Sequence, residues 1–180
     1  MLKAVLSRKD LSTVSEYYEC VEDLLHCARV LELNDFAHHI CTTRLQHSLN
    51  VSYYNFLLCR KLHLDARSAA RAGLLHDFFF YDRKNHEKIR NNHCAEHANI
   101  AYYNATSMFP ISELEGDMIV NHMWPMTPHL PRFAETYVIT LVDKFCATAE
   151  VMTGALHLTR VKCSAAASLA LMLLVNKLIK

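Results

Sequence analysis

Histidine and aspartate side chains stand at positions of this 180-residue chain where helical periodicity turns them toward the interior. His47 is spaced with Val51, Tyr54 and Leu58 at i, i+4, i+7 and i+11, which places an imidazole on an otherwise apolar helix face. Asp143 also lies among apolar neighbours. A lone inward histidine is most often a satisfied core residue, but an unpaired buried carboxylate is costly unless it is hydrogen-bonded, paired or bound to a metal.

Two further features belong with them: the pair His76–Asp77 at the end of a predicted helix, and His122 near the end of another. Inward imidazoles and carboxylates from several separate helices share one economical explanation, a bound cation. Such a mixed ligand set suits Fe, Mn, Zn, Ni or Co without distinguishing among them. The sequence therefore predicts a divalent transition metal cofactor, with one or two ions per chain.

Four blocks carry a resemblance to a known family. The order H…HD…D places His47 about 29 residues before His76–Asp77 and Asp143 far downstream, and this order resembles the HD-domain phosphohydrolases. The resemblance covers about residues 47–152, through the segments RAGLLHDFFFYD (71–82), HANIAYYNA (97–105), NHMWPMTP (121–128) and LVDKFCATAEVM (141–152).

The resemblance implies a ligand set. His47, His76, Asp77 and Asp143 would hold a first metal ion, and His97 and His122 would hold a second, with Asp77 bridging the two. Asp77 would also be the catalytic residue that orients a metal-bound hydroxide, which forms because the metal lowers the pKa of water from 15.7 to around 7. The family often has proline directly after the position of His97, where this chain has Ala98, and His93 one turn earlier is an alternative to His97.

The resemblance also implies an activity, the hydrolysis of a phosphomonoester or phosphodiester, with a nucleotide-like substrate expected. Candidate substrate-binding residues are those next to the motifs, although solvated surface charge is the more common role of such cations: Arg83, Lys84, His129 and Lys144. Two alternatives remain open. One is a di-iron oxygenase of the HD type, because it uses the same ligands. The other is a non-catalytic, nucleotide-sensing HD module.

The elements that must position these residues are predicted to be helices. Only 3 glycines and 4 prolines in 180 residues favour long helices with short connections. We expect one compact all-α bundle, and two helix starts have capping-box spacing, Thr13–Glu16 and Ser112–Glu115. Pro131 is expected in the first turn of one helix and Gly154 at its C-terminal cap. The expected helices cover residues 13–33, 43–62, 66–76, 94–108, 113–124, 132–153 and 164–179.

The domain organisation follows from these elements: residues 1–40 form an N-terminal helical segment packed on the core, residues 41–155 the HD domain, and residues 156–180 an apolar C-terminal helix of the same domain. That last helix is a possible surface for a homo-oligomer. Its apolar run, Ala165 to Val175, is too short to span a bilayer, so no membrane partner is expected.

Composition argues against nucleic-acid binding and indicates the compartment of the protein. The formal net charge of +1, without a basic stripe, gives no case for duplex nucleic acid as a partner. The 7 cysteines form no C-x-x-C pair, and the N-terminus lacks a signal-peptide pattern, so a reduced, cytoplasmic protein is expected. The remaining histidines fit no ligand pattern: His26, His38, His39, His63, His86 and His157.

Overall fold

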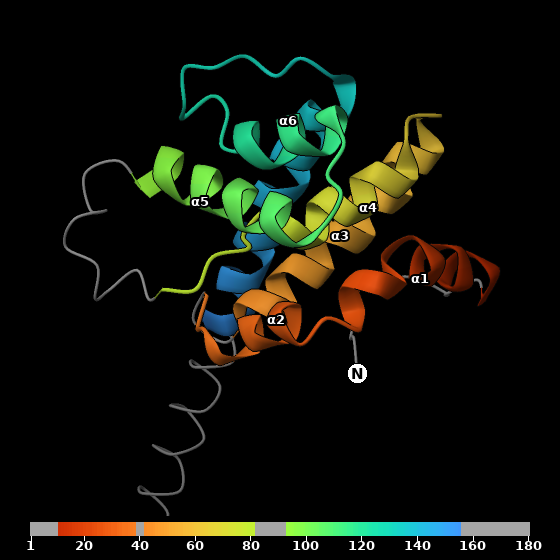
Figure 1. Ribbon diagram of the computed structural model, residues 1–180, viewed down its shortest axis with the longest axis horizontal. Helices are drawn as coiled ribbons and strands as arrows, with labels where there is room; N and C mark the ends of the chain where they lie inside the picture. Colours follow the sequence, from red (N-terminus) through yellow and green to blue (C-terminus); the bar gives the residue numbers. More distant parts are fainter. Residues whose placement is uncertain (1–10, 39–41, 82–92, 156–180) are drawn as a thin grey trace, which may run out of the picture.

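The computed structural model describes residues 11–38, 42–81 and 93–155. In these ranges every regular element is helical, and the β-type pairing there is a single antiparallel bridge between Ala37 and Thr43. The prediction of an all-α bundle is confirmed (Figure 1). The helices are α1 (Leu11–Leu25), α2 (Ala28–Leu31), the 3-10 helix η1 (Glu32–Asp35), α3 (Arg44–Lys61), α4 (Ala66–Leu75), α5 (His93–Met108), α6 (Glu113–Asn121) and an unlabelled helix over residues 134–155.

Helices α3 and α4 pack against each other at the centre of the bundle. Each starts where the sequence predicts, because Thr43 and Asp65 accept hydrogen bonds from the backbone N–H groups of Gln46 and Ser68. Gly73 permits a close approach: a Cβ atom there would lie 2.6 Å from Cα of Ser52 in α3. This contact fixes the position of the end of α4 relative to α3.

A buried arginine ties three helices together. Arg71 of α4 is 6% exposed, and its guanidinium donates to Oε1 of Glu115 in α6 at 3.0 Å and to Oδ1 of Asp23 in α1 at 2.6 Å. Glu115 also completes the predicted capping box with Ser112. The two carboxylates compensate for the desolvation of the arginine, so α1 and α6 are held against α4.

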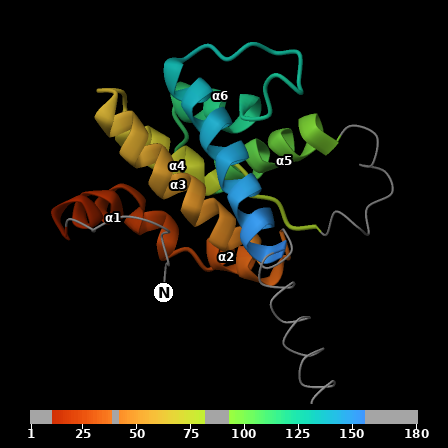
Figure 2. The same cartoon turned by 180° about the vertical axis from the view of Figure 1, so that it is seen from behind.

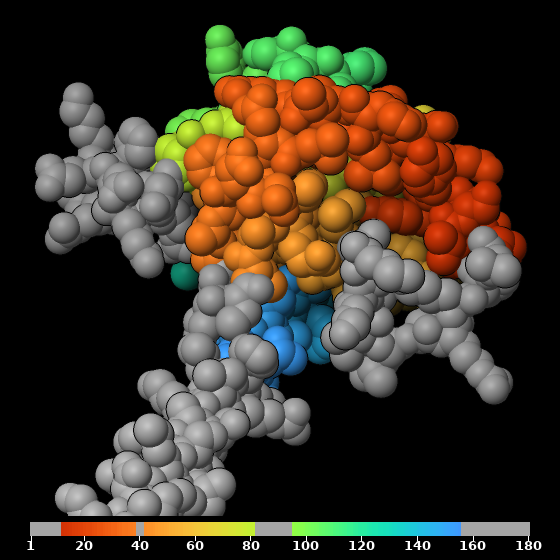
Figure 3. Space-filling view, turned by 90° about the horizontal axis from the view of Figure 1, so that it is seen from below, coloured from red at the N-terminus to blue at the C-terminus, as the bar shows by residue number. Residues whose placement is uncertain are grey.

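The helix over residues 134–155 lies behind α3, α4 and α5 in Figure 1 and in front of them in Figure 2. It buries Val138, Ile139, Val142 and Cys146 in the core. Seen from below, residues of α1, α2 and η1 make up much of the visible surface, and part of the 134–155 helix is also visible (Figure 3).

The predicted helix over residues 13–33 is wrong in its extent. Helix α1 begins earlier, at Leu11, and ends at Leu25, while Cys27 is extended and precedes the short α2. The Thr13 and Glu16 side chains do not cap α1, because both accept hydrogen bonds from the guanidinium of Arg60 in α3.

Three predicted helix ends also need correction. Helix α6 ends at Asn121 and not near Trp124. The next helix begins at residue 134, so Pro131 precedes its first turn. Gly154 is helical and is not a cap, because the helix still continues at residue 155. The segment after Asp77 leaves the helix as predicted, whereas the expected loop at 82–92 and the expected helix at 164–179 lie outside the described residues.

None of the described helices combines the length and the apolarity that a bilayer crossing requires.

Candidate metal centre

His47 lies inside the bundle, on α3, with both ring nitrogens close to carboxylates of the 134–155 helix. Its Nδ1 is 3.0 Å from Oε2 of Glu150, and its Nε2 is 3.0 Å from Oδ1 of Asp143. Glu150 is itself held by the side-chain amide of Asn50, which donates to Oε1 at 2.9 Å. A histidine whose outer nitrogen donates to a carboxylate presents its other nitrogen as a metal ligand, and this is the arrangement here.

His76 and Asp77 follow directly after α4, and both are buried. Nδ1 of His76 lies 2.9 Å from the carbonyl oxygen of Gly73, which assigns the ring proton to Nδ1 and leaves a lone pair on Nε2. That Nε2 atom is fully buried and has no hydrogen-bond partner among the described residues. An orphaned imidazole nitrogen in the interior is a costly feature that a bound cation would explain.

The backbone after Asp77 is clamped from two sides. The buried guanidinium of Arg44 donates to the carbonyl oxygens of Phe79 at 2.6 Å and Tyr81 at 3.1 Å. From the other side, the side-chain amide of Asn104 in α5 donates to the carbonyl oxygen of Phe78 at 2.9 Å. These bonds fix the path of the chain immediately beyond the carboxylate.

His97 of α5 and His122 at the end of α6 face each other. Their Nε2 atoms are 3.0 Å apart, and Nδ1 of His122 is 2.8 Å from the carbonyl oxygen of Ile119. The second contact assigns the proton of the His122 ring to Nδ1, so that its Nε2 carries a lone pair. Two imidazole nitrogens aimed at the same point form half of a ligand set for a cation.

Asp77 lies between these two groups of histidines. Its Oδ2 is 4.0 Å from Nε2 of His76, whereas its Oδ1 is 3.4 Å from Nε2 of His97. Asp143 Oδ1 is 3.6 Å from Nε2 of His76, on the same side as His47. The two oxygens of one carboxylate thus face two different clusters of nitrogen ligands.

These distances are compatible with metal binding. Two ligand atoms that each lie about 2.1 Å from one ion can be no more than about 4.2 Å apart. Each of the distances given above between ring nitrogens and carboxylate oxygens, and between the rings of His97 and His122, falls within that limit. Potential ligand sets with mutual separations within 4.8 Å are His47–His76–Asp143, His76–Asp77–His122 and His38–His47–Asp77.

The electrostatics keep three of these groups, the two aspartates and His122, in the protonation state that a metal ligand needs. Burial would raise the pKa of Asp77, but the rings of His76 and His97 outweigh it and hold that pKa well below its usual range. Burial would also raise the pKa of Asp143, but its hydrogen bond with His47 and the nearby ring of His76 outweigh it and hold that pKa far below normal. Burial, together with the neighbouring rings of His76 and His97, lowers the pKa of His122 to about 3.

His76 and His47 are exceptions. Burial would lower the pKa of His76, but the carboxylates of Asp77 and Asp143 outweigh it and raise that pKa. Burial would likewise lower the pKa of His47, but hydrogen bonds to Asp143 and Glu150 raise it to about 10. In the metal-free protein its ring is therefore a cation between two carboxylates. A divalent ion would replace the proton on Nε2 and would supply the positive charge between the two carboxylates in its place.

The structure thus brings together all six predicted ligands: His47, His76, Asp77, His97, His122 and Asp143. His97 occupies the second cluster, and the side chain of the alternative ligand, His93, lies outside the described part of the structure. Glu150 was not among the residues predicted from the sequence. Its position seven residues after Asp143, two helical turns along the same face, is the signal that could have found it.

The expectation that His38 has no connection with the site needs correction. Its Nδ1 lies 3.8 Å from Oδ2 of Asp77, and its ring stacks on that of His47 with centroids 4.1 Å apart. No helical periodicity points to it, because His38 lies between η1 and α3. Of the other histidines without a ligand pattern, His26 is exposed, and its Nδ1 bonds to the carbonyl oxygen of Glu22 in its own helix.

The predicted substrate-binding residues have different positions. Lys144 is half-buried beside the candidate centre, and its ammonium donates to the carbonyl oxygens of His122 and Thr140 at 3.3 Å each. His129 is exposed and lines a cavity of about 580 Å³ with Asn99 and Arg132, among other residues. Arg83 and Lys84 lie outside the described residues.

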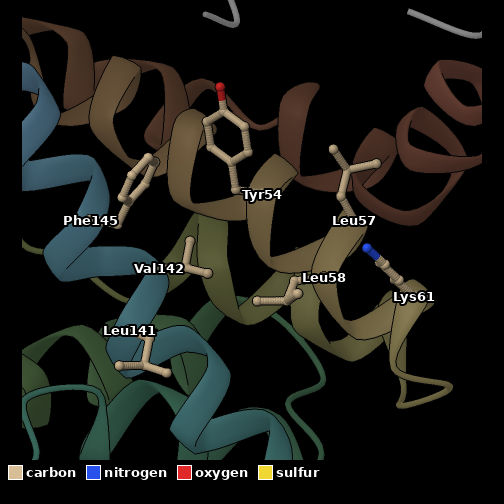
Figure 4. A pocket seen from close by; sticks show the side chains of 7 residues that line it. All are labelled: Tyr54, Leu57, Leu58, Lys61, Leu141, Val142 and Phe145. Atoms are coloured by element: carbon tan, nitrogen blue, oxygen red, sulfur yellow. The ribbon is translucent and has the colours of Figure 1, made fainter. Parts of the chain in front are cut away.

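A second hollow lies between α3 and the 134–155 helix. It is an apolar groove of about 360 Å³ whose lining contains no histidine or carboxylate (Figure 4). Leu141 and Phe145 on one wall are 67% and 64% exposed. The groove lacks the side chains that could bind a metal ion, so it is separate from the candidate metal centre. His47 and Asp143, the ligands that these two helices contribute, do not line the groove.

Comparison of the chain with protein-family models, with curated proteins and with solved structures found no match.

Proposed function

We propose that this protein is a metal-dependent phosphohydrolase of the HD type that hydrolyses a phosphomonoester or phosphodiester of nucleotide-like chemistry. The observation that carries the proposal is the placement of Asp77, whose two carboxylate oxygens face two clusters of histidine nitrogens. One carboxylate between two nitrogen clusters fits a pair of ions better than a single ion. Two-metal sites are a common solution for phosphate ester hydrolysis.

The distances support the ligand roles that the resemblance implies. His47, His76, Asp77 and Asp143 would hold one ion, and His97 and His122 would hold a second, with Asp77 shared. Bound there, the ions would supply a water of lowered pKa and positive charge for the phosphoryl oxygens. The chain's own contribution is to keep Asp77 anionic and to fix the tautomers of His76 and His122 through the carbonyl oxygens of Gly73 and Ile119.

Two buried cysteines, Cys146 and Cys59, are unsuited to act as a competing nucleophile. Cys146 is one turn from Asp143, but burial raises the pKa of its thiol to about 12, and burial has the same effect on Cys59. A thiol that stays protonated at neutral pH is a poor nucleophile. This supports a mechanism in which water, and not a cysteine, attacks phosphorus.

Lys144 is the cation that we assign to the substrate. Its ammonium lies within 3.3 Å of the carbonyl oxygen of the ligand His122, so it is beside the second cluster of nitrogens. A flexible ammonium can exchange a backbone carbonyl for a phosphoryl oxygen when a substrate arrives. We expect Lys144→Ala to raise KM for a phosphate ester more than it lowers the metal content.

The test is a screen of phosphomonoesters, nucleotides and cyclic dinucleotides, with apo-protein reloaded separately with Mn²⁺, Fe²⁺, Co²⁺, Ni²⁺ and Zn²⁺. The expected result is phosphate or nucleotide release that depends on metal and is abolished by Asp77→Ala. His26→Ala is the matched control, because that exposed histidine follows directly after α1 and its ring bonds to the carbonyl oxygen of Glu22 in α1. Oxygen uptake without phosphate release would instead support a di-iron oxygenase. Metal-independent ligand binding that is unaffected by Asp77→Ala would support a non-catalytic sensor.

A further inference from the structure

A seventh side chain reaches the candidate centre from outside the predicted ligand set. We propose that His38 is a direct ligand of the metal ion held by His47, His76, Asp77 and Asp143, an inference that rests on the metal centre of the proposed function. Such a ligand would occupy a coordination position that otherwise would be open to water or substrate.

The first support is distance. Nδ1 of His38 lies 3.8 Å from Oδ2 of Asp77, within the limit of about 4.2 Å for two ligands of one ion. The same oxygen is 4.0 Å from Nε2 of His76. His38 and His76 therefore converge on one oxygen of Asp77, while His97 approaches the other. This geometry assigns His38 to the ion on the side of His47 and not to the second ion.

The second support is burial. The side chain of His38 is 9% exposed, and that of Asp77 is 7% exposed. The ring of His38 stacks on the ring of His47 at an interplanar angle of 26°. His38, His47 and Asp77 form one of the groups whose ligand atoms all lie within 4.8 Å of one another. A histidine whose only role was at the surface would not be enclosed among the ligands.

The third support is the fixed position of the backbone. The N–H of His38 donates to the carbonyl oxygen of Thr42 at 3.0 Å, and the N–H of Arg44 donates to that of Phe36 at 2.8 Å. These bonds accompany the bridge between Ala37 and Thr43, directly before α3. Because α3 carries His47, the two rings are positioned by one rigid piece of structure, as metal ligands need to be.

The test is metal binding by apo-protein, measured without any substrate. Wild type, His38→Ala and the control His26→Ala are titrated with Co²⁺, which reports its ligand number through the intensity of its visible absorption. We expect His38→Ala to bind the tighter Co²⁺ equivalent at least about tenfold more weakly and with an altered spectrum, since even the loss of an outer partner of a ligand costs 10–100-fold. His26→Ala should match wild type. Circular dichroism of the metal-free proteins checks that each variant folds.

Free imidazole separates a ligand from a packing residue. In His38→Ala it should restore the wild-type Co²⁺ spectrum by filling the space that the ring leaves, and it should not change the wild-type protein. A folded His38→Ala variant that binds Co²⁺ with wild-type affinity and spectrum would overturn the proposal. Weakened binding without any spectral change or imidazole rescue would also overturn it. Neither outcome depends on phosphate release, so a protein that binds metal through His38 but hydrolyses no ester would refute the proposed function alone.

Discussion

The close approach of α3 and α4 leads to a prediction that joins fold stability to the metal centre. In Gly73→Ala the new Cβ would lie 2.6 Å from Cα and 2.9 Å from N of Ser52. Both are backbone atoms, so no side-chain rotation can relieve the contact. With ordinary carbon contacts near 3.5–4.0 Å, the two helices must separate locally by about 1 Å.

The magnitude follows from two opposing terms. Overpacking of a tight interface typically costs about 1–3 kcal/mol, and a contact with backbone belongs at the upper end of that range. Replacing a helical glycine by alanine returns about 1 kcal/mol of helix propensity. We therefore expect a net loss of about 2 kcal/mol, which for a domain of this size lowers Tm by roughly 4–8 °C.

Gly116→Ala is the matched control. Its Cβ would meet Cε2 of Tyr102 at 2.9 Å, but this atom is the far part of a side chain that is 39% exposed and can move away. The propensity gain should then offset the contact, and the stability should change by less than about 1 kcal/mol. Both variants are compared with wild type by thermal and urea unfolding of apo-protein.

The Gly73→Ala variant also tests the candidate metal centre. Because α3 carries His47 and α4 leads into His76–Asp77, a shift of about 1 Å between the helices should also weaken metal binding in Gly73→Ala and leave it intact in Gly116→Ala. A Gly73→Ala protein as stable as wild type, with unchanged metal affinity, would refute the close-approach reasoning.

Three further predictions concern charged side chains. Glu150→Gln should weaken metal binding about 10–100-fold in a Co²⁺ titration, because it weakens the partner that orients His47; unchanged affinity would contradict that role. Arg71→Leu should destabilise the fold by about 3–5 kcal/mol in urea unfolding, since Glu115 would remain buried without its cation; a loss below about 1 kcal/mol would show that the pair is dispensable. The pKa of Asp23 is lowered, since its bonds with Arg71 outweigh its burial, so its contribution to stability is present above the ordinary aspartate pKa and is lost as the pH falls through the folded pKa. Asp23→Asn should therefore flatten the acid limb of the pH–stability curve, and an unchanged limb would rule out this contribution.

The sequence predicted those features that periodicity and capping control. His47 and Asp143 could be placed inward because each lies among apolar residues at helical spacing. The starts of α3, α4 and α6 could be predicted because Thr43, Asp65 and Ser112 each accept a bond from the backbone three residues on. Such features depend on residues that are close together in the chain, so they can be predicted from the sequence.

Other features depend on tertiary contacts and could not be predicted. Thr13 and Glu16 have the spacing of a capping box, but both side chains accept hydrogen bonds from Arg60 of α3 instead. His38 has no periodic neighbours, and only the pairing of its backbone with Thr42 places it against the ligands. Helical periodicity identifies ligands on helices, but it does not identify ligands on the connections between helices.

Elemental analysis of the purified protein tests the central claim most directly. The account predicts transition-metal ions at close to two per chain, and it predicts that Asp77→Ala loses bound metal and phosphohydrolase activity together, because this carboxylate faces both histidine clusters. A metal-free wild-type protein, or an Asp77→Ala variant that remains active without metal, would contradict it.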